Sequence, residues 1–138
     1  MKRRLYLDTS AYLCILLADA GSQRLSEQTS NAELYSSVVL VLESRRNLAR
    51  LAREAVLTAS QYEECQARVT SDIERFVLRD LTLDLCDTLP MPAVITPRSL
   101  DMAHLRTALW FHAQVPLTKF VTLDTAQAQA GRELGLPA

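Results

Sequence analysis

Two places in the chain put a carboxylate directly after a short apolar run. Asp8 follows Leu5-Tyr6-Leu7 and precedes Thr9-Ser10, and Asp124 follows Phe120-Val121-Thr122-Leu123. A helical pattern comes next in both places, so we expect a buried strand that turns into a helix. Because open α/β sheets bind ligands outside the carboxyl ends of their strands, both carboxylates would lie where a ligand binds. For the first stretch, the competing interpretation is an ordinary helix cap.

Two further carboxylates fall on predicted helices. Glu43 sits beside the apolar stripe of a helix expected over 38–53, where the residues change from apolar to basic. Asp101 falls in the first turn of a helix expected over 99–113, at the positive end of the helix dipole. Each has a plainer interpretation, as a solvated face for Glu43 and a dipole-favoured surface acid for Asp101. One turn beyond Asp101, His104 is either a packed core histidine or a residue of the site.

The remaining segments must position these acids. The pattern predicts a short helix in the polar stretch before Glu33, a brief strand over 34–37, helices over 61–76 and 126–134, and a strand over 78–85. Pro90, Pro92 and Pro97 predict a loop between residues 86 and 98. Alternating strands and helices favour an α/β fold in three layers, a short parallel sheet with helices on both faces. At 138 residues we expect one domain over 1–138.

Composition narrows the possible partners and compartments. A net charge of −1 gives no overall attraction to nucleic acid, so binding to a polyanion needs a local patch or a metal ion. Arginine makes up 13 of the 15 basic residues, which suits bidentate phosphate contacts. The three dispersed cysteines argue against a zinc site and fit a reducing cytoplasm. No run approaches the ~18 apolar residues of a membrane span, so we expect a cytoplasmic protein without a membrane partner.

If the sheet is parallel, the four carboxylates can converge at one edge. Four carboxylates within a few ångströms repel strongly, since one pair at ~4 Å costs about 4 kcal/mol at an effective dielectric of 20. Such a cluster needs a cation or raised pKa values. The proposed ligand set contains only oxygen donors, with no cysteine and no histidine assigned to it, and such a set favours Mg²⁺ or Mn²⁺.

Four stretches together resemble PIN-domain nucleases and, at this length, the VapC-type ribonuclease toxins of bacterial toxin–antitoxin pairs. The stretches are Leu7-Asp8-Thr9-Ser10, Val39-Leu40-Val41-Leu42-Glu43-Ser44, Ser99 to Leu109, and Phe120-Val121-Thr122-Leu123-Asp124. The third is the most specific, because Ala103-His104-Leu105 and Thr107-Ala108-Leu109 follow Asp101 as in that family. Two features depart from the family: prolines stand where it has a helix, and its final edge strand must be very short or absent here.

The resemblance implies a metal-dependent endoribonuclease, a homodimer and inhibition by a cognate antitoxin. Asp8 and Asp101 would hold the first ion, with Asp124 and Glu43 completing its shell or holding a second. Ser10 and Thr122 would donate hydrogen bonds to these carboxylates. The arginines that could form a basic lane for RNA, or a solvated helix face, are Arg45, Arg46, Arg50 and Arg53.

Two rival interpretations remain. An aspartyl phosphatase also begins with a strand and then Asp, but it needs a second Asp two residues later, where this chain has Ser10. A PIN-like module that binds RNA or a partner without cutting would keep the same sequence pattern. A metal-dependent RNA cleavage assay separates these alternatives.

Overall fold

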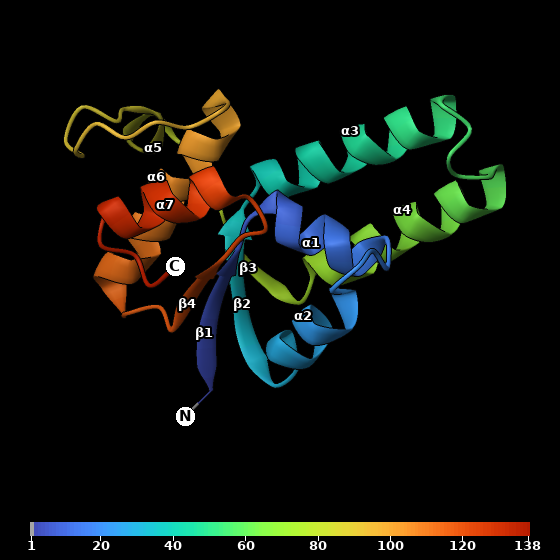
Figure 1. The fold of residues 1–138 in the computed structure, drawn as a ribbon, viewed down its shortest axis with the longest axis horizontal. Coiled ribbons are helices and arrows are strands. Elements are labelled where there is room, and N and C mark those ends of the chain that lie inside the picture. Colours follow the sequence, from blue (N-terminus) through green and yellow to red (C-terminus); the bar gives the residue numbers. More distant parts are fainter. Residues whose placement is uncertain (1) are drawn as a thin grey trace.

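Four short parallel strands form the centre of the protein in a computed structural model, which describes residues 2–138 (Figure 1). The strands in these residues are β1 (Arg3–Leu7), β2 (Ala32–Ser37), β3 (Phe76–Arg79) and β4 (Lys119–Val121), in the order β3-β2-β1-β4. All three pairings are parallel. The predicted α/β fold with a short parallel sheet is therefore confirmed.

Strand β1 is buried on both faces because helices cover the sheet from either side. Leu5 and Leu7 pack on one face with the helices α1 (Thr9–Leu16) and α2 (Ser22–Thr29). Tyr6 points to the other face, where it packs with residues of α6 (Ser99–Gln114) and α7 (Thr125–Glu133). The continuous apolar run Leu5-Tyr6-Leu7 is the pattern expected of a strand buried in this way.

Helices α3 (Val39–Arg53) and α4 (Ala59–Ile73) form a pair that extends away from the sheet (Figure 1). Leu48 of α3 and Val69 of α4 are fully buried against Tyr12 of α1. Thr58 begins α4 with a capping box, in which its hydroxyl accepts from the Gln61 amide. The helix predicted over 61–76 thus exists, but it starts two residues earlier and ends at Ile73.

The strand predicted over 78–85 is wrong except at residues 78–79. Strand β3 covers Phe76–Arg79, and the residues after Thr82 form the short helix α5 (Leu83–Cys86). Arg79 pairs with Ser37, the last residue of β2, so the chain beyond Arg79 has no neighbouring strand to pair with. Residues 87–98, which contain the three prolines, form no helix or strand, as predicted.

The order in which strands are added to the sheet reverses at β1. Its neighbour on one side is β2 and its neighbour on the other is β4, so the chain leaves β1 and β4 in adjacent positions at the carboxyl edge of the sheet. Ligands of open α/β sheets bind at such a point. Among residues 2–138 no helix has the length and apolar character needed to cross a bilayer.

Candidate active site

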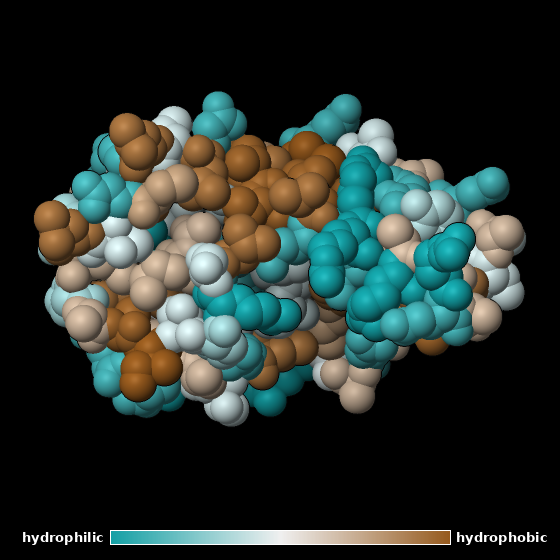
Figure 2. All heavy atoms as spheres, turned by 90° about the horizontal axis from the view of Figure 1, so that it is seen from above, coloured by the Kyte–Doolittle hydropathy of each residue, from teal (hydrophilic) through white to brown (hydrophobic). Residues whose placement is uncertain are grey.

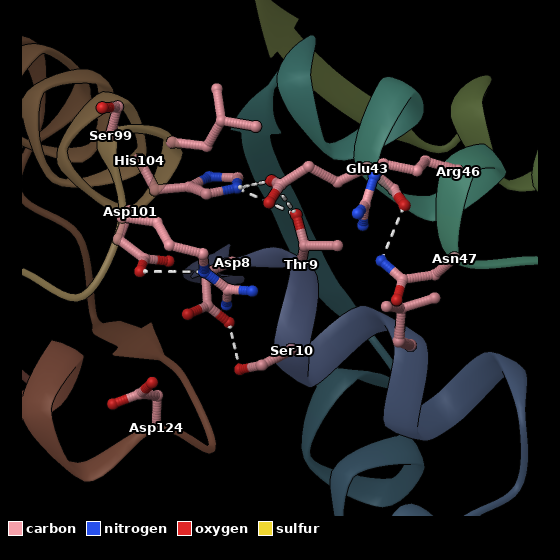
Figure 3. Close-up of a pocket in the computed structure, with 13 residues that line it drawn as sticks. Asp8, Thr9, Ser10, Glu43, Arg46, Asn47, Ser99, Asp101, His104 and Asp124 are labelled. Atoms are coloured by element: carbon pink, nitrogen blue, oxygen red, sulfur yellow. Dashed lines mark hydrogen bonds and ion pairs between the residues drawn. The ribbon is translucent and has the colours of Figure 1, made fainter. Parts of the chain in front are cut away.

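All four predicted carboxylates line one pocket of about 370 Å³ at the carboxyl edge of the sheet (Figure 3). Asp8 follows β1 and Asp124 follows β4, and the parallel pairing of Leu7 with Val121 brings these strand ends together. Glu43 comes from α3 and Asp101 from the first turn of α6. Segments far apart in the sequence therefore supply one acidic pocket.

Asp8 is held more firmly than any other acid of the pocket. It is 2% exposed and caps α1, accepting from the Ala11 amide at 3.2 Å. The hydroxyl of Ser10 donates to its Oδ1 at 2.7 Å, and the hydroxyl of Thr122 donates to its Oδ2. Ser10 and Thr122 thus make the contacts predicted for them, and the helix-cap interpretation of Asp8 is also correct.

Asp124 has a similar local role. It caps α7 by accepting from the Gln127 amide at 3.0 Å. The fully buried side chain of Gln127 then donates from Nε2 to the backbone carbonyl of Asp101 at 2.8 Å. Gln127 therefore ties α7 to the start of α6 and fixes two acid-bearing helix ends to each other.

Glu43 is not part of a solvated helix face. Its Oε1 accepts from the Thr9 hydroxyl at 2.6 Å and lies 2.9 Å from Nε2 of His104 (Figure 3). Burial alone would raise the pKa of Glu43, but the hydrogen bonds from His104 and Thr9 outweigh it, so the pKa lies below its ordinary value. Glu43 is thereby kept ionised.

His104 is a core residue that also touches the site. It is 1% exposed, its Nδ1 lies 2.8 Å from the Tyr6 hydroxyl, and its Nε2 contacts both Glu43 and Thr9. The two interpretations of His104 in the sequence are therefore not exclusive. It packs in the core and bonds an acid of the pocket.

Asp101 has few partners for a buried acid. It is 8% exposed, and its Oδ2 lacks a hydrogen-bond partner among the described residues. Its ion pair is with Nε of Arg98, at 3.7 Å. Burial raises the pKa of Asp101; Arg98 opposes this, and the charges of Glu43, Asp8 and Asp124 add to the rise.

The acids are spaced more widely than the sequence suggested. Within residues 2–138, no three His, Cys, Asp or Glu side chains lie close enough together to hold a metal ion as they stand. Three contacts hold two of the acids in place: Thr9 and His104 each bond Glu43, and Arg98 pairs with Asp101. Like charges repel, so the carboxylates turn to these donors.

The predicted basic lane along α3 does not form as a unit. Arg45 turns toward α4 and donates to Gln66 and Thr70, and Arg50 pairs with Glu54 at 3.0 Å. Arg53 is exposed near the end of α3. Of the four, Arg46 alone lines the acidic pocket.

Three residues of the site were not found from the sequence. Arg98 lines the pocket, Thr9 donates to Glu43, and Gln127 donates to the backbone carbonyl of Asp101. Thr9 follows Asp8 directly and Arg98 stands three residues before Asp101, so their positions were a usable signal. Gln127 had none, because a buried glutamine and a surface glutamine look alike in one sequence.

In comparisons with known proteins, the chain matches no protein-family model and no curated protein.

Proposed function

We propose that the protein is a divalent-metal-dependent endoribonuclease of the PIN type. The carrying observation is that Asp8, Glu43, Asp101 and Asp124 line a single pocket at the carboxyl edge of a parallel sheet. The resemblance of four sequence stretches to VapC-type toxins supports the same proposal. Metal-dependent hydrolysis of phosphodiesters is the reaction that such a set of carboxylates serves.

The residues present fit Mg²⁺ or Mn²⁺. The donors are carboxylate and hydroxyl oxygens, which these cations prefer. The buried Oδ2 of Asp101 has no hydrogen-bond partner among residues 2–138, and the pKa of Asp101 is raised by burial and, to a smaller extent, by the charges of Glu43, Asp8 and Asp124. Asp8 and Asp101 would hold the ion, with Asp124 and Glu43 completing the site.

When bound, the ion would supply Lewis-acid chemistry, offsetting charge on a phosphodiester and lowering the pKa of water. Other residues of the chain hold the proposed ligands in position. Ser10 and Thr122 orient both oxygens of Asp8, and Gln127 fixes the start of α6, on which Asp101 lies. Arg46 lies on α3 and Arg98 immediately precedes α6, and both line the pocket, where they can contact RNA phosphates.

A cleavage assay tests this function. With Mg²⁺ or Mn²⁺ the purified protein should cut RNA, and chelator should stop the reaction. Asp8→Asn and Asp101→Asn should each lower the rate by more than about 100-fold while circular dichroism stays native, because outer partners of a metal already carry 10–100-fold. An active Asp8→Asn protein in nuclease-free preparations contradicts the assignment, and RNA binding without cleavage by wild type favours the non-catalytic module.

We further propose that the protein acts as the toxin of a toxin–antitoxin pair. A second groove of about 580 Å³ is lined by residues of α1, of α3 and of the loop that follows α3, among them the apolar residues Leu13, Leu17 and Leu57. Ser10, Leu13 and Asn47 line both this groove and the acidic pocket. An antitoxin segment seated in the groove would therefore reach the site. Co-expression should yield a complex, and expression alone should arrest growth.

A homodimer is the expected assembly. Figure 2 shows an apolar area beside the hydrophilic side chains of α3. Leu42 on α3 and Leu83 on α5 are 67% and 86% exposed, and an exposed apolar area is a common sign of a protein interface. Analytical ultracentrifugation should find dimers at micromolar concentration, and Leu42→Glu with Leu83→Glu should yield monomers. A monomeric wild type rejects the dimer.

A further inference from the structure

His104 is the one buried histidine that touches an acid of the pocket, and the function proposed above gives it no task. We propose that His104 is a positioning residue, which with Thr9 and Tyr6 fixes one oxygen of the Glu43 carboxylate and leaves the other for the pocket. The proposal rests on the proposed function for its catalytic consequence. The contact itself does not depend on that function.

The hydrogen positions follow from the neighbours of the imidazole. Oε1 of Glu43 already accepts from the Thr9 hydroxyl at 2.6 Å, and Nε2 of His104 lies 2.9 Å from the same oxygen. A carboxylate has no hydrogen to give, so Nε2 must carry one. In the neutral ring Nδ1 then lacks a hydrogen and accepts from the Tyr6 hydroxyl at 2.8 Å.

Tyr6 is suited to keep its hydrogen. Its side chain is fully buried on β1, and its hydroxyl lies 2.8 Å from Nδ1 of His104. A protonated phenol is a donor, which favours the ring form with hydrogen on Nε2. The strand at the centre of the sheet thereby sets which nitrogen of His104 faces Glu43.

The hydrogen bonds from Thr9 and His104 hold Glu43 in place against the repulsion within the pocket. Glu43 and Asp101 line the same pocket, and their like charges repel each other. A glutamate has several rotatable bonds and would turn to solvent if nothing held it. Oε2 of Glu43 accepts no hydrogen bond from the described residues, so it is the oxygen left for a ligand. Because His104 lies one turn after Asp101, α6 carries both an acid and the donor that holds its counterpart.

A matched pair of variants separates positioning from packing. In His104→Gln the amide nitrogen can replace Nε2 and donate to Glu43, whereas in His104→Asn the shorter amide replaces Nδ1 and cannot reach it. We expect His104→Asn to lower kcat for RNA cleavage and the affinity for Mn²⁺ by about 10–100-fold, with KM for RNA unchanged. His104→Gln should stay within several-fold of wild type, and both variants should keep native circular dichroism.

Two results would overturn the proposal. Equal losses of Mn²⁺ affinity and kcat in the two variants would mean that His104 only fills the core. An imidazole ¹⁵N spectrum with the hydrogen on Nδ1 would mean that the contact with Glu43 is not as described.

The spectrum also separates this proposal from the nuclease function. If wild type neither cuts RNA nor binds Mn²⁺, the nuclease proposal fails by itself. An Nε2–H signal that changes in Glu43→Gln still supports the positioning contact, and one that does not change rejects it.

Discussion

Glu43 and Asp101 face the same pocket, yet their surroundings shift their pKa values in opposite directions. Glu43 receives hydrogen bonds from Thr9 and His104, which lower its pKa, whereas Asp101 is buried with an oxygen that has no hydrogen bond, and its pKa is raised. In the absence of a metal ion, the well-bonded Glu43 stabilises the folded protein and the poorly bonded Asp101 destabilises it. Asp101 therefore keeps an oxygen available for a ligand, and the protein is less stable for it.

The largest expected effect is the response to a metal ion. Mn²⁺ at a hundredfold excess over Kd should stabilise wild type by about 2.7 kcal/mol. Asp101→Asn should lose most of this gain, because Oδ2 of Asp101 accepts no hydrogen bond from residues 2–138 and has only a long ion pair with Arg98, at 3.7 Å. Thermal unfolding with and without Mn²⁺ measures the difference. An Asp101→Asn protein that responds as wild type does would place the ion elsewhere.

Glu43→Gln should destabilise the metal-free protein by about 1–3 kcal/mol, because it disturbs the donors Thr9 and His104. Since the folded pKa of Glu43 is lowered, its contribution is present above the ordinary value of 4.5 and is lost as pH falls through the folded pKa. Urea unfolding at several pH values should show the gap between wild type and variant closing in that window.

A matched change on an exposed face gives the control for Glu43→Gln. Glu64 lies exposed on α4, so Glu64→Gln should change the free energy of unfolding little. Equal effects of the two substitutions would return Glu43 to a solvated-face role.

Asp101→Asn should have the opposite sign in the presence of chelator. The folded pKa of Asp101 is raised, so stability is greatest below the ordinary value of 3.8 and is lost as pH rises through the folded pKa. Near pH 7 the variant should melt above wild type, and the two should converge toward pH 3.8. Melting below wild type would instead show that the helix-dipole contribution of roughly 0.3–1 kcal/mol dominates.

The smallest expected effect is on the salt dependence of RNA binding, and it concerns Arg46 and Arg98, which line the pocket. In an Asp8→Asn background, which prevents cleavage, Arg46→Gln and Arg98→Gln should each reduce the slope of log K against log salt for single-stranded RNA by about 0.7. Arg45→Gln is the control, because that guanidinium is engaged with α4. A slope that changes only with Arg45→Gln would move the RNA path onto the α3–α4 pair.

Local patterns in the sequence were enough to predict the strand–acid–helix units. Three consecutive apolar residues before Asp8 are typical of a strand buried on both faces, and the Thr and Ser after it favour the start of a helix. Residues close together in the sequence were therefore enough to predict β1 and α1. The same reasoning found β4 and α7 around Asp124, and it found the acids of α3 and α6. It failed at residues 80–85, where alternation suggested a strand but β2 had already ended.

The tertiary structure decided how these acids are held. Hydrogen bonds between residues far apart, such as Thr9 with Glu43 and Tyr6 with His104, depend on which strands become neighbours, and one sequence does not reveal that. The same holds for Gln127, whose partner is a backbone carbonyl on another helix. Residue types determined that the pocket is acidic, because charge is a property of each side chain. Packing decided which acid is satisfied and which is not, because hydrogen bonds need specific distances between elements.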